Sequence, residues 1–214
     1  MTKESSTKIK QYDLCFPVDV STSSRATIGG MTGNNSCGSR SLYYGNMVHN
    51  VEAIETILDD GSLYTFEKIN NDYLVAKNNK NRQYKIIEEL IKIYQTYKHE
   101  ISDNFPKTQR RVGGYNLDLI NPSGFNTSNI LVGSEGTLSL FNKIKLKLSH
   151  IPKQKILGLC SFQNFRDAME ITKEIVKLMP TAVELMDENL LNLAKAIPMF
   201  QESIKKFFKG KART

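Results

Sequence analysis

The 214-residue sequence has no tryptophan, three cysteines, six prolines and no long uninterrupted apolar run. A membrane-spanning helix needs about 18 apolar residues in succession, so we expect none. Three cysteines without a Cys-x-x-Cys pair exclude a disulfide framework and a four-cysteine zinc site, and they favour a reducing compartment. The polar first residues lack the apolar core of a secretory signal. We therefore expect a cytoplasmic protein, with peripheral attachment at the inner membrane surface left open.

The composition is that of a globular protein, with 40% apolar and 24% charged residues. The length allows one domain, or one and part of another. The formal net charge of +7 could indicate nucleic-acid binding. However, the lysines are spread along the chain, and no arginine-rich run, RRM or zinc-finger signature occurs. A solvated lysine-rich surface is the better interpretation, and a basic nucleic-acid-binding module is the weaker alternative.

The first 150 residues predict a mixture of loops, a hairpin, a helix and a strand. Residues 1–13 are polar and expected to be disordered, and residues 15–45, dense in Gly, Ser, Thr and Asn, are expected to form loops and turns. Two short strands, 51–58 and 62–66, flank an Asp-Gly pair and predict a hairpin. Apolar residues at spacings of three and four predict an amphipathic helix over 82–99.

One further strand and a second unit are expected after the helix. Over residues 137–148, Ile144, Leu146 and Leu148 alternate with lysines, which predicts a strand with one apolar and one cationic face. Pro152 begins a new unit. Its pattern predicts four elements and a short basic tail: a strand over 156–162, a helix over 165–179 capped by Asn164, a strand over 183–186, a helix over 187–196 and the tail 200–214. This order predicts an α+β fold.

Two glycine-rich segments carry the chemical signal. The first is Thr27-Ile28-Gly29-Gly30, followed by Gly33, Asn34, Asn35, Ser36 and Gly38. The second is Gly133-Ser134-Glu135-Gly136-Thr137-Leu138. Glycines let a backbone approach a ligand closely, and exposed N–H groups in such turns can bind anions. Either segment alone could equally be a plain turn between elements, and neither is a GxGxxG fingerprint.

The order of four motifs resembles one family closely. The motifs are ATIGGMTGNNSCGSRSLYYG, NVEAIETILDDGS, RRVGGYNLD and NILVGSEGTLSLF. They resemble the FAD-linked oxidases with a PCMH-type flavin domain, the vanillyl-alcohol-oxidase superfamily, and within it the D-lactate, D-2-hydroxyglutarate dehydrogenase and glycolate oxidase flavin-subunit branch. FPVDVS before the motifs and TAVELMDENLL after them add to the resemblance, which covers residues 14–200.

The resemblance implies a fold, a domain organisation and a cofactor. The fold would be the second half of a PCMH-type FAD-binding domain, over residues 14–150, followed by the start of an FAD-linked oxidase cap domain, over residues 151–214. The cofactor would be FAD. By the same resemblance, the residues in contact with it would be Pro17, Asp19, Ser23, Thr27, Ile28, Gly29, Gly30, Asn34, Asn35, Ser36, Gly38, Glu135, Gly136, Thr137 and Leu138. The turn Asn34–Gly38 would hold the ribityl and pyrophosphate portion.

The sequence also departs from the family pattern. Ser139 stands where the family usually has glycine. Nothing resembles the first, pyrophosphate-binding half of the flavin domain, and the cap's catalytic and metal-ligating histidines have no counterpart. His49, His99 and His150 are single residues without His-x-His spacing, so no catalytic residue and no metal ligand is predicted.

Three hypotheses on function follow. The first is an FAD-binding oxidoreductase fragment of the family that oxidises D-2-hydroxy acids by hydride transfer to flavin. Its missing flavin half and cap would come from a separate chain, and the chain alone would be catalytically incomplete. The second is a non-catalytic remnant of a split or decaying gene. The third is the nucleic-acid-binding module.

Overall fold

The computed structural model describes residues 8–70, 81–121 and 123–207 of the chain. It divides into two units, Met1–Ile151 and Pro152–Thr214.

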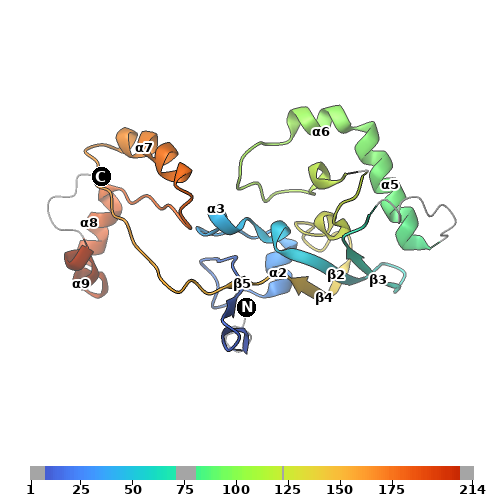
Figure 1. The fold of residues 1–214 in the computed structure, drawn as a ribbon, viewed down its shortest axis with the longest axis horizontal. Coiled ribbons are helices and arrows are strands. Elements are labelled where there is room, and N and C mark those ends of the chain that lie inside the picture. The colour runs from blue at the N-terminus through green and yellow to red at the C-terminus, as the bar shows by residue number, and fades with distance from the viewer. Residues whose placement is uncertain (1–7, 71–80, 122, 208–214) are drawn as a thin grey trace. The chain divides into compact units, whose positions relative to one another are not determined.

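An antiparallel three-stranded sheet is the centre of the first unit (Figure 1). Its strands are β2 (Val51–Ile57), β3 (Leu63–Glu67) and β4 (Leu140–Leu146), in the order β3-β2-β4. The hairpin expected around the Asp-Gly pair is confirmed as β2 and β3, with Ile54 opposite Phe66. The strand expected over 137–148 is confirmed as β4, which pairs Ile54 with Ile144 across the sheet.

The two faces of this sheet differ as the alternation predicts. Ile54 is fully buried and Ile144 packs against the core. On the other face, Lys143 pairs with Glu55 at 3.0 Å and Lys145 with Glu52 at 3.2 Å. The lysines of β4 therefore belong to the solvent-facing side of the sheet.

Helices lie beside both edge strands (Figure 1). The helix expected over 82–99 is confirmed as α5 (Arg82–Thr96), capped by Asn81, and α6 (Lys98–Asn104) follows it after Tyr97. Gln83 of α5 donates to a carbonyl of β3. The core side of α5 is centred on the buried Ile87. Ile86, Leu90, Ile91 and Tyr94 pack partly against the core, whereas Ile93 and Tyr97 are exposed.

The segment expected to be loops and turns contains two short helices. These are α2 (Ile28–Gly33), which lies beside β4, and α3 (Ser41–Tyr44). Thr27 caps α2, because its Oγ1 accepts a hydrogen bond from the Gly30 N–H at 3.1 Å. Three one-turn helices, η1 (Met47–His49), η2 (Leu117–Leu119) and η3 (Thr127–Ile130), connect the remaining elements of the unit.

A second, two-stranded sheet joins the start and end of the first unit. β1 (Leu14–Cys15) pairs antiparallel with β5 (Ser149–His150), and the Ile151 N–H donates to the Asp13 carbonyl at 3.0 Å. Residues 8–10 form a helical turn in which Ile9 packs against the core. Residues 8–13 are thus ordered, unlike the disordered 1–13 expected. Residues 1–7 lie outside the described part of the chain.

The second unit contains three helices and no strand among its described residues, 152–207. The helix expected over 165–179 is confirmed as α7 (Phe165–Lys177), with the Asn164 side chain capping the Asp167 N–H at 2.9 Å. α8 (Glu188–Ala196), capped by Asp187, is also confirmed. α9 (Pro198–Phe207) occupies much of what was expected to be a basic tail, of which residues 208–214 lie outside the described part.

The strands expected over 156–162 and 183–186 are wrong, because both segments are irregular. A strand needs a neighbouring backbone to hydrogen-bond with. No described residue of 152–163 or 180–186 forms such a bond with another segment. Ile156 is 94% exposed and Leu157 is 70% exposed, so their apolar side chains also lack a covering layer.

Candidate functional site

The two glycine-rich segments lie against each other in the first unit. The Gly133 N–H donates to the Thr32 carbonyl at 2.9 Å, and the Glu135 N–H donates to the Gly33 carbonyl at 3.0 Å. These bonds join the end of α2 to the turn that precedes β4. Segments about 100 positions apart in the sequence therefore form one surface, which we call the glycine junction and define as residues 27–38 and 133–138.

Two buried polar atoms in the glycine junction have no hydrogen-bond partner among the described residues. They are Nδ2 of Asn35, which is 1% exposed, and Oγ of Ser134, which is 2% exposed. The other end of the Asn35 amide is used, because its Oδ1 accepts from the Val48 N–H at 3.0 Å. Buried polar atoms are usually paired, and an unpaired one costs about 1–3 kcal/mol. Each of these two atoms therefore lacks, within the described structure, the partner that a buried polar group usually has.

The predicted residues before α2 have different surroundings. Pro17 is fully buried, and Ser23 is exposed in a turn. Asp19 is half-buried and accepts hydrogen bonds from Ser39 Oγ and the Arg40 N–H, both at 3.1 Å. A side chain at Gly38 would collide with the Asp19 backbone, so the close approach of these two turns requires glycine. Asp19 therefore holds the 38–40 turn in place through these two hydrogen bonds.

The first turn of α2 presents an open surface. Gly29 and Gly30 are exposed, and a methyl group added at Gly29 would meet nothing within 4 Å. Ile28 packs partly against the core and Thr27 caps the helix. Residues 27–30, which were expected to contact FAD, thus form the cap and first turn of a short helix, with free space beside Gly29.

The residues that follow α2 form a tight turn. Asn34 ends the helix and is exposed, whereas Asn35 is buried with a φ of +48°. The Ser36 N–H donates to the Met31 carbonyl at 2.9 Å, and the Gly38 N–H donates to Ser41 Oγ at 3.0 Å. The backbone N–H groups of Cys37 and Ser39 donate to no residue in the described ranges.

The predicted residues before β4 are exposed. Glu135 has a φ of +51°, and Gly136 has open space beside it. Thr137 Oγ1 donates to the Ser134 carbonyl at 2.6 Å, and Leu138 is 42% exposed. Ser139, the departure from the family pattern, has a buried Oγ without a partner in the described structure.

A third segment, residues 109–116, contacts both parts of the glycine junction. Arg110 Nη2 donates to Cys37 Sγ at 3.5 Å, and the Tyr115 hydroxyl is 2.8 Å from Thr137 Oγ1. The buried Asn116 donates from Nδ2 to the Val132 carbonyl at 2.8 Å. The motif RRVGGYNLD contributed to the resemblance, but no site residue was predicted in it. Its two adjacent glycines were the one local signal that could have directed attention to it.

The histidines do not form a reactive cluster. His49 Nδ1 accepts a hydrogen bond from the Asn46 N–H at 3.0 Å. Desolvation lowers the pKa of His49, and the nearby Arg111 charge lowers it further, which suits a neutral acceptor. Among the described residues, no three His, Cys, Asp or Glu side chains gather as a metal site would require.

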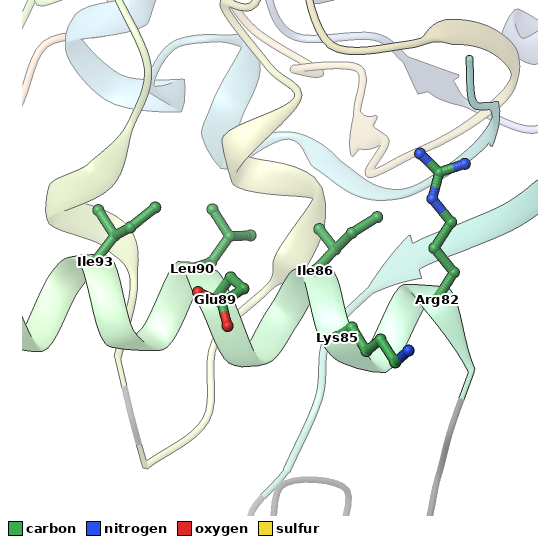
Figure 2. Close-up of a pocket in the computed structure, with 6 residues that line it drawn as sticks. All are labelled: Arg82, Lys85, Ile86, Glu89, Leu90 and Ile93. Carbon is green, nitrogen blue, oxygen red and sulfur yellow. The ribbon is translucent and has the colours of Figure 1, made fainter. Parts of the chain in front are cut away.

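A groove along α5 lies apart from the glycine junction. Figure 2 shows that Ile86, Leu90 and Ile93 project from the same side of the helix, with Arg82 at one end. The groove is lined by three aliphatic and three charged residues of α5, and it contains none of the residues expected to contact FAD. We therefore place the candidate site at the glycine junction.

No described helix combines the length and the apolar content needed to cross a membrane.

Comparison with known families gives two matches. The family model described as "FAD binding domain" matches residues 3–67. The family model described as "FAD linked oxidases, C-terminal domain" matches residues 151–210. The first match falls in the first structural unit, and all but the first residue of the second match falls in the second unit.

Individual relatives agree with the family models. A D-2-hydroxyglutarate dehydrogenase of Haemophilus influenzae is 30% identical over an alignment of 194 residues, which covers 87% of this chain and 19% of that protein. A probable mitochondrial D-lactate dehydrogenase of Danio rerio is 25% identical over 186 residues, covering 86% of this chain and 28% of the relative. The chain thus spans between 19% and 28% of the length of these two relatives.

A solved structure shares the fold. An alkyldihydroxyacetonephosphate synthase aligns with 96% of this chain and 32% of its own length, at a TM-score of 0.54 and 17% identity. This likeness supports the mixed α+β architecture. The two family matches and the dehydrogenase relatives show that the chain belongs to the FAD-linked oxidases that carry a PCMH-type FAD-binding domain.

Proposed function

We propose that this chain supplies part of the flavin-binding surface of an oxidoreductase that oxidises D-2-hydroxy acids by hydride transfer to FAD. The observation that carries the proposal is the glycine junction, where two backbone hydrogen bonds join the segments around Gly33 and Gly133. The names of the relatives, D-2-hydroxyglutarate and D-lactate dehydrogenase, support the substrate class.

The residues of the glycine junction fit a flavin dinucleotide. The unpaired Asn35 Nδ2 and Ser134 Oγ offer polar contacts, and the space beside Gly29 and Gly136 leaves room for a flat ligand. When bound, FAD supplies the hydride acceptor, and the protein positions and tunes it. In this proposal the cofactor lies on the surface that the α2 turn and the Glu135 turn form together, and Asp19 keeps the 38–40 turn in place.

The domain assignment is part of the same proposal. Residues 14–150 would be the C-terminal part of the FAD-binding domain, and residues 151–214 the beginning of the cap domain. The remaining cofactor contacts and the catalytic base would come from polypeptide outside this sequence, for which a separately encoded chain is one source. A cytoplasmic location remains a prediction from the sequence.

The test is a titration of the purified chain with FAD, followed by flavin fluorescence. We expect weak, saturable binding, with a Kd of roughly 100 μM or above, because only part of the clamp is present. Desalting should therefore remove the yellow colour. A stoichiometric yellow protein would contradict the predicted weakness, and no saturable binding at millimolar FAD would contradict the proposed function itself.

A further inference from the structure

The backbone of Gly133 is enclosed by two other segments of the first unit. Its φ is +86°, a conformation that residues with a Cβ rarely adopt. A Cβ built at this position would lie 3.2 Å from the Gly114 carbonyl oxygen and 3.4 Å from Cβ of Asn35. The side-chain nitrogen of Asn116 would lie 3.8 Å from it. The second part of the glycine junction therefore begins in a narrow space between Asn35 and residues 114–116.

The Asn116 side chain holds the backbone just before Gly133. Asn116 is 2% exposed, and its Nδ2 donates to the Val132 carbonyl at 2.8 Å and to the Asn129 carbonyl at 3.1 Å. A side-chain amide nitrogen carries two N–H donors, and a buried donor needs an acceptor. The two carbonyls therefore satisfy the nitrogen, and the nitrogen in turn fixes the direction of both carbonyls.

The Val132 carbonyl and the Gly133 N–H belong to one peptide group. Because a peptide group is planar and trans, its carbonyl and its N–H point in opposite directions. Asn116 binds the carbonyl, and the Thr32 carbonyl of α2 accepts from the N–H at 2.9 Å. By fixing the carbonyl, Asn116 also fixes the N–H that forms one of the two backbone bonds between the glycine-rich segments.

We propose that Asn116 is a positioning residue for the FAD-binding surface, which it maintains by orienting the Val132–Gly133 peptide group toward α2. The assignment rests on the proposed function and adds to it a residue that acts through the backbone of the second glycine-rich turn. It also gives the RRVGGYNLD segment two attachments to that turn: Asn116 holds its start, and the Tyr115 hydroxyl lies 2.8 Å from Thr137 Oγ1 near its end.

Asn50 provides a matched control for the loss of a buried amide. It is 4% exposed, and its Nδ2 also donates to two carbonyls, those of Tyr44 and Asn46, both at 2.9 Å. Neither carbonyl belongs to the glycine junction. Asn50→Ala and Asn116→Ala should therefore lower the melting temperature by similar amounts, whereas only Asn116→Ala should loosen the junction.

Hydrogen exchange of the full chain, read by mass spectrometry on peptides, tests the positioning role without the cofactor. Asn116→Ala should speed exchange of residues 131–137 at least about tenfold, because the loss of two hydrogen bonds lowers the cost of local opening. Residues 66–70, where the Ile69 N–H donates to the Phe125 carbonyl, should change less than about twofold. Asn50→Ala should leave exchange of residues 131–137 within about twofold of the parent chain. Unchanged exchange of residues 131–137 in Asn116→Ala would overturn the assignment.

Titration with FAD then connects the turn to the cofactor. Asn116→Ala should lower FAD affinity at least about threefold, since FAD must then order the turn on binding, and Asn50→Ala should change it less than about twofold. In the parent chain, FAD at about ten times its Kd should slow exchange of residues 131–137 about tenfold, because bound ligand stabilises the ordered turn by mass action. This last measurement needs no variant, so it decides the question even if Asn116→Ala does not fold.

The failure of this assignment and the failure of the proposed function give different results. Faster exchange of residues 131–137 in Asn116→Ala with unchanged FAD affinity would overturn the positioning role and leave FAD binding standing. FAD binding to the parent chain without slower exchange of residues 131–137 would overturn it as well. If the parent chain binds no FAD at millimolar concentration, the proposed function fails, and this assignment fails with it.

Discussion

At the scale of a single residue, a substitution at Gly29 should change cofactor binding without destabilising the fold. It lies in α2, and a methyl group there would meet only open space. Gly29→Ala should therefore leave the free energy of unfolding unchanged or raise it by up to about 1 kcal/mol, since alanine favours helix more than glycine does. If the cofactor lies over this turn, FAD affinity should fall at least about fivefold.

Chemical denaturation and FAD titration of Gly29→Ala are the two measurements. Gly30 is a less clean position, because a Cβ there would lie 3.1 Å from the Thr27 Oγ1 that caps the helix. FAD affinity equal to that of the parent chain would remove the first turn of α2 from the proposed site.

Ser139 offers a second residue-scale test. Its buried hydroxyl has no partner in the described structure. An unpaired buried hydroxyl is unfavourable, so Ser139→Ala should be neutral or stabilising by up to about 1 kcal/mol in urea denaturation. A loss of more than 1 kcal/mol would mean that the hydroxyl has a partner, such as a bound water molecule.

At the scale of elements, the sheet predicts opposite outcomes for its two faces. Lys145 on β4 is exposed and pairs with a partly exposed Glu52, so Lys145→Ala should change the unfolding free energy by no more than about 0.5 kcal/mol. Ile54 on the neighbouring strand is fully buried, and Ile54→Ala should cost about 2–5 kcal/mol. Urea denaturation of both variants measures the two free energies of unfolding. Similar losses of unfolding free energy in the two variants would contradict the assignment of the solvent-facing and core-facing sides of the sheet.

Asp60, in the turn between β2 and β3, should make a contribution to folding stability that is lost at acid pH. Hydrogen bonds from Ser62, and then the Arg82 side chain, lower the pKa of Asp60 from 3.8 to about 2. A lowered acid pKa stabilises the folded state above the unfolded value, and this contribution is lost as pH falls through the folded value. The melting temperature should thus fall between about pH 4 and pH 2, by less in Asp60→Asn. Identical pH profiles for the two proteins would contradict this.

Elements with complete local signals were predictable from the sequence, and those that depend on distant partners were not. Three such signals act within a few residues and were followed by the expected element. The Asp-Gly turn predicted the β2–β3 hairpin, the Asn164 cap predicted α7, and the alternation of lysines predicted β4. The strands at 156–162 and 183–186 lack a hydrogen-bonding neighbour among the described residues. α2 was missed because glycines disfavour helices, whereas its Thr27 cap and its bonds to Gly133 and Glu135 favour this one.

The candidate site was predictable only through the resemblance, and only in part. The two glycine-rich segments were identified, but nothing in their composition says that they meet. Arg110, Tyr115 and Asn116 were missed because their roles depend on contacts with Cys37, Thr137 and Val132, which are distant in the sequence. Whether the predicted residues contact FAD stays a prediction.

At the scale of the whole molecule, the second unit has too little core to be stable by itself. Among residues 152–207 only Ala168 and Leu191 are buried hydrophobic residues, whereas Ile156, Leu178 and Met199 are more than 70% exposed. We expect the purified chain to self-associate, because exposed apolar patches and unpaired backbone promote aggregation. Size-exclusion chromatography with light scattering tests this, and a monodisperse monomer that melts cooperatively would contradict it.

Hydrogen exchange offers an independent measurement of the same property. Amides of α7 and α8 should exchange much faster than those of β2. Helices with few buried apolar contacts open locally at a low cost in free energy, and exchange takes place from the open state. Equal protection in the two units would mean that the second unit is covered in solution.

The pairing of β1 with β5 has a topological consequence for the first unit. Because Leu14 lies opposite His150 and the Asp13 carbonyl bonds to the Ile151 N–H, the polypeptide enters and leaves this unit at one place. Such a unit tolerates circular permutation, since a short linker can join its two ends without crossing the core. Opening the chain at the exposed β2–β3 turn instead would give a permuted protein with the same sheet and the same glycine junction.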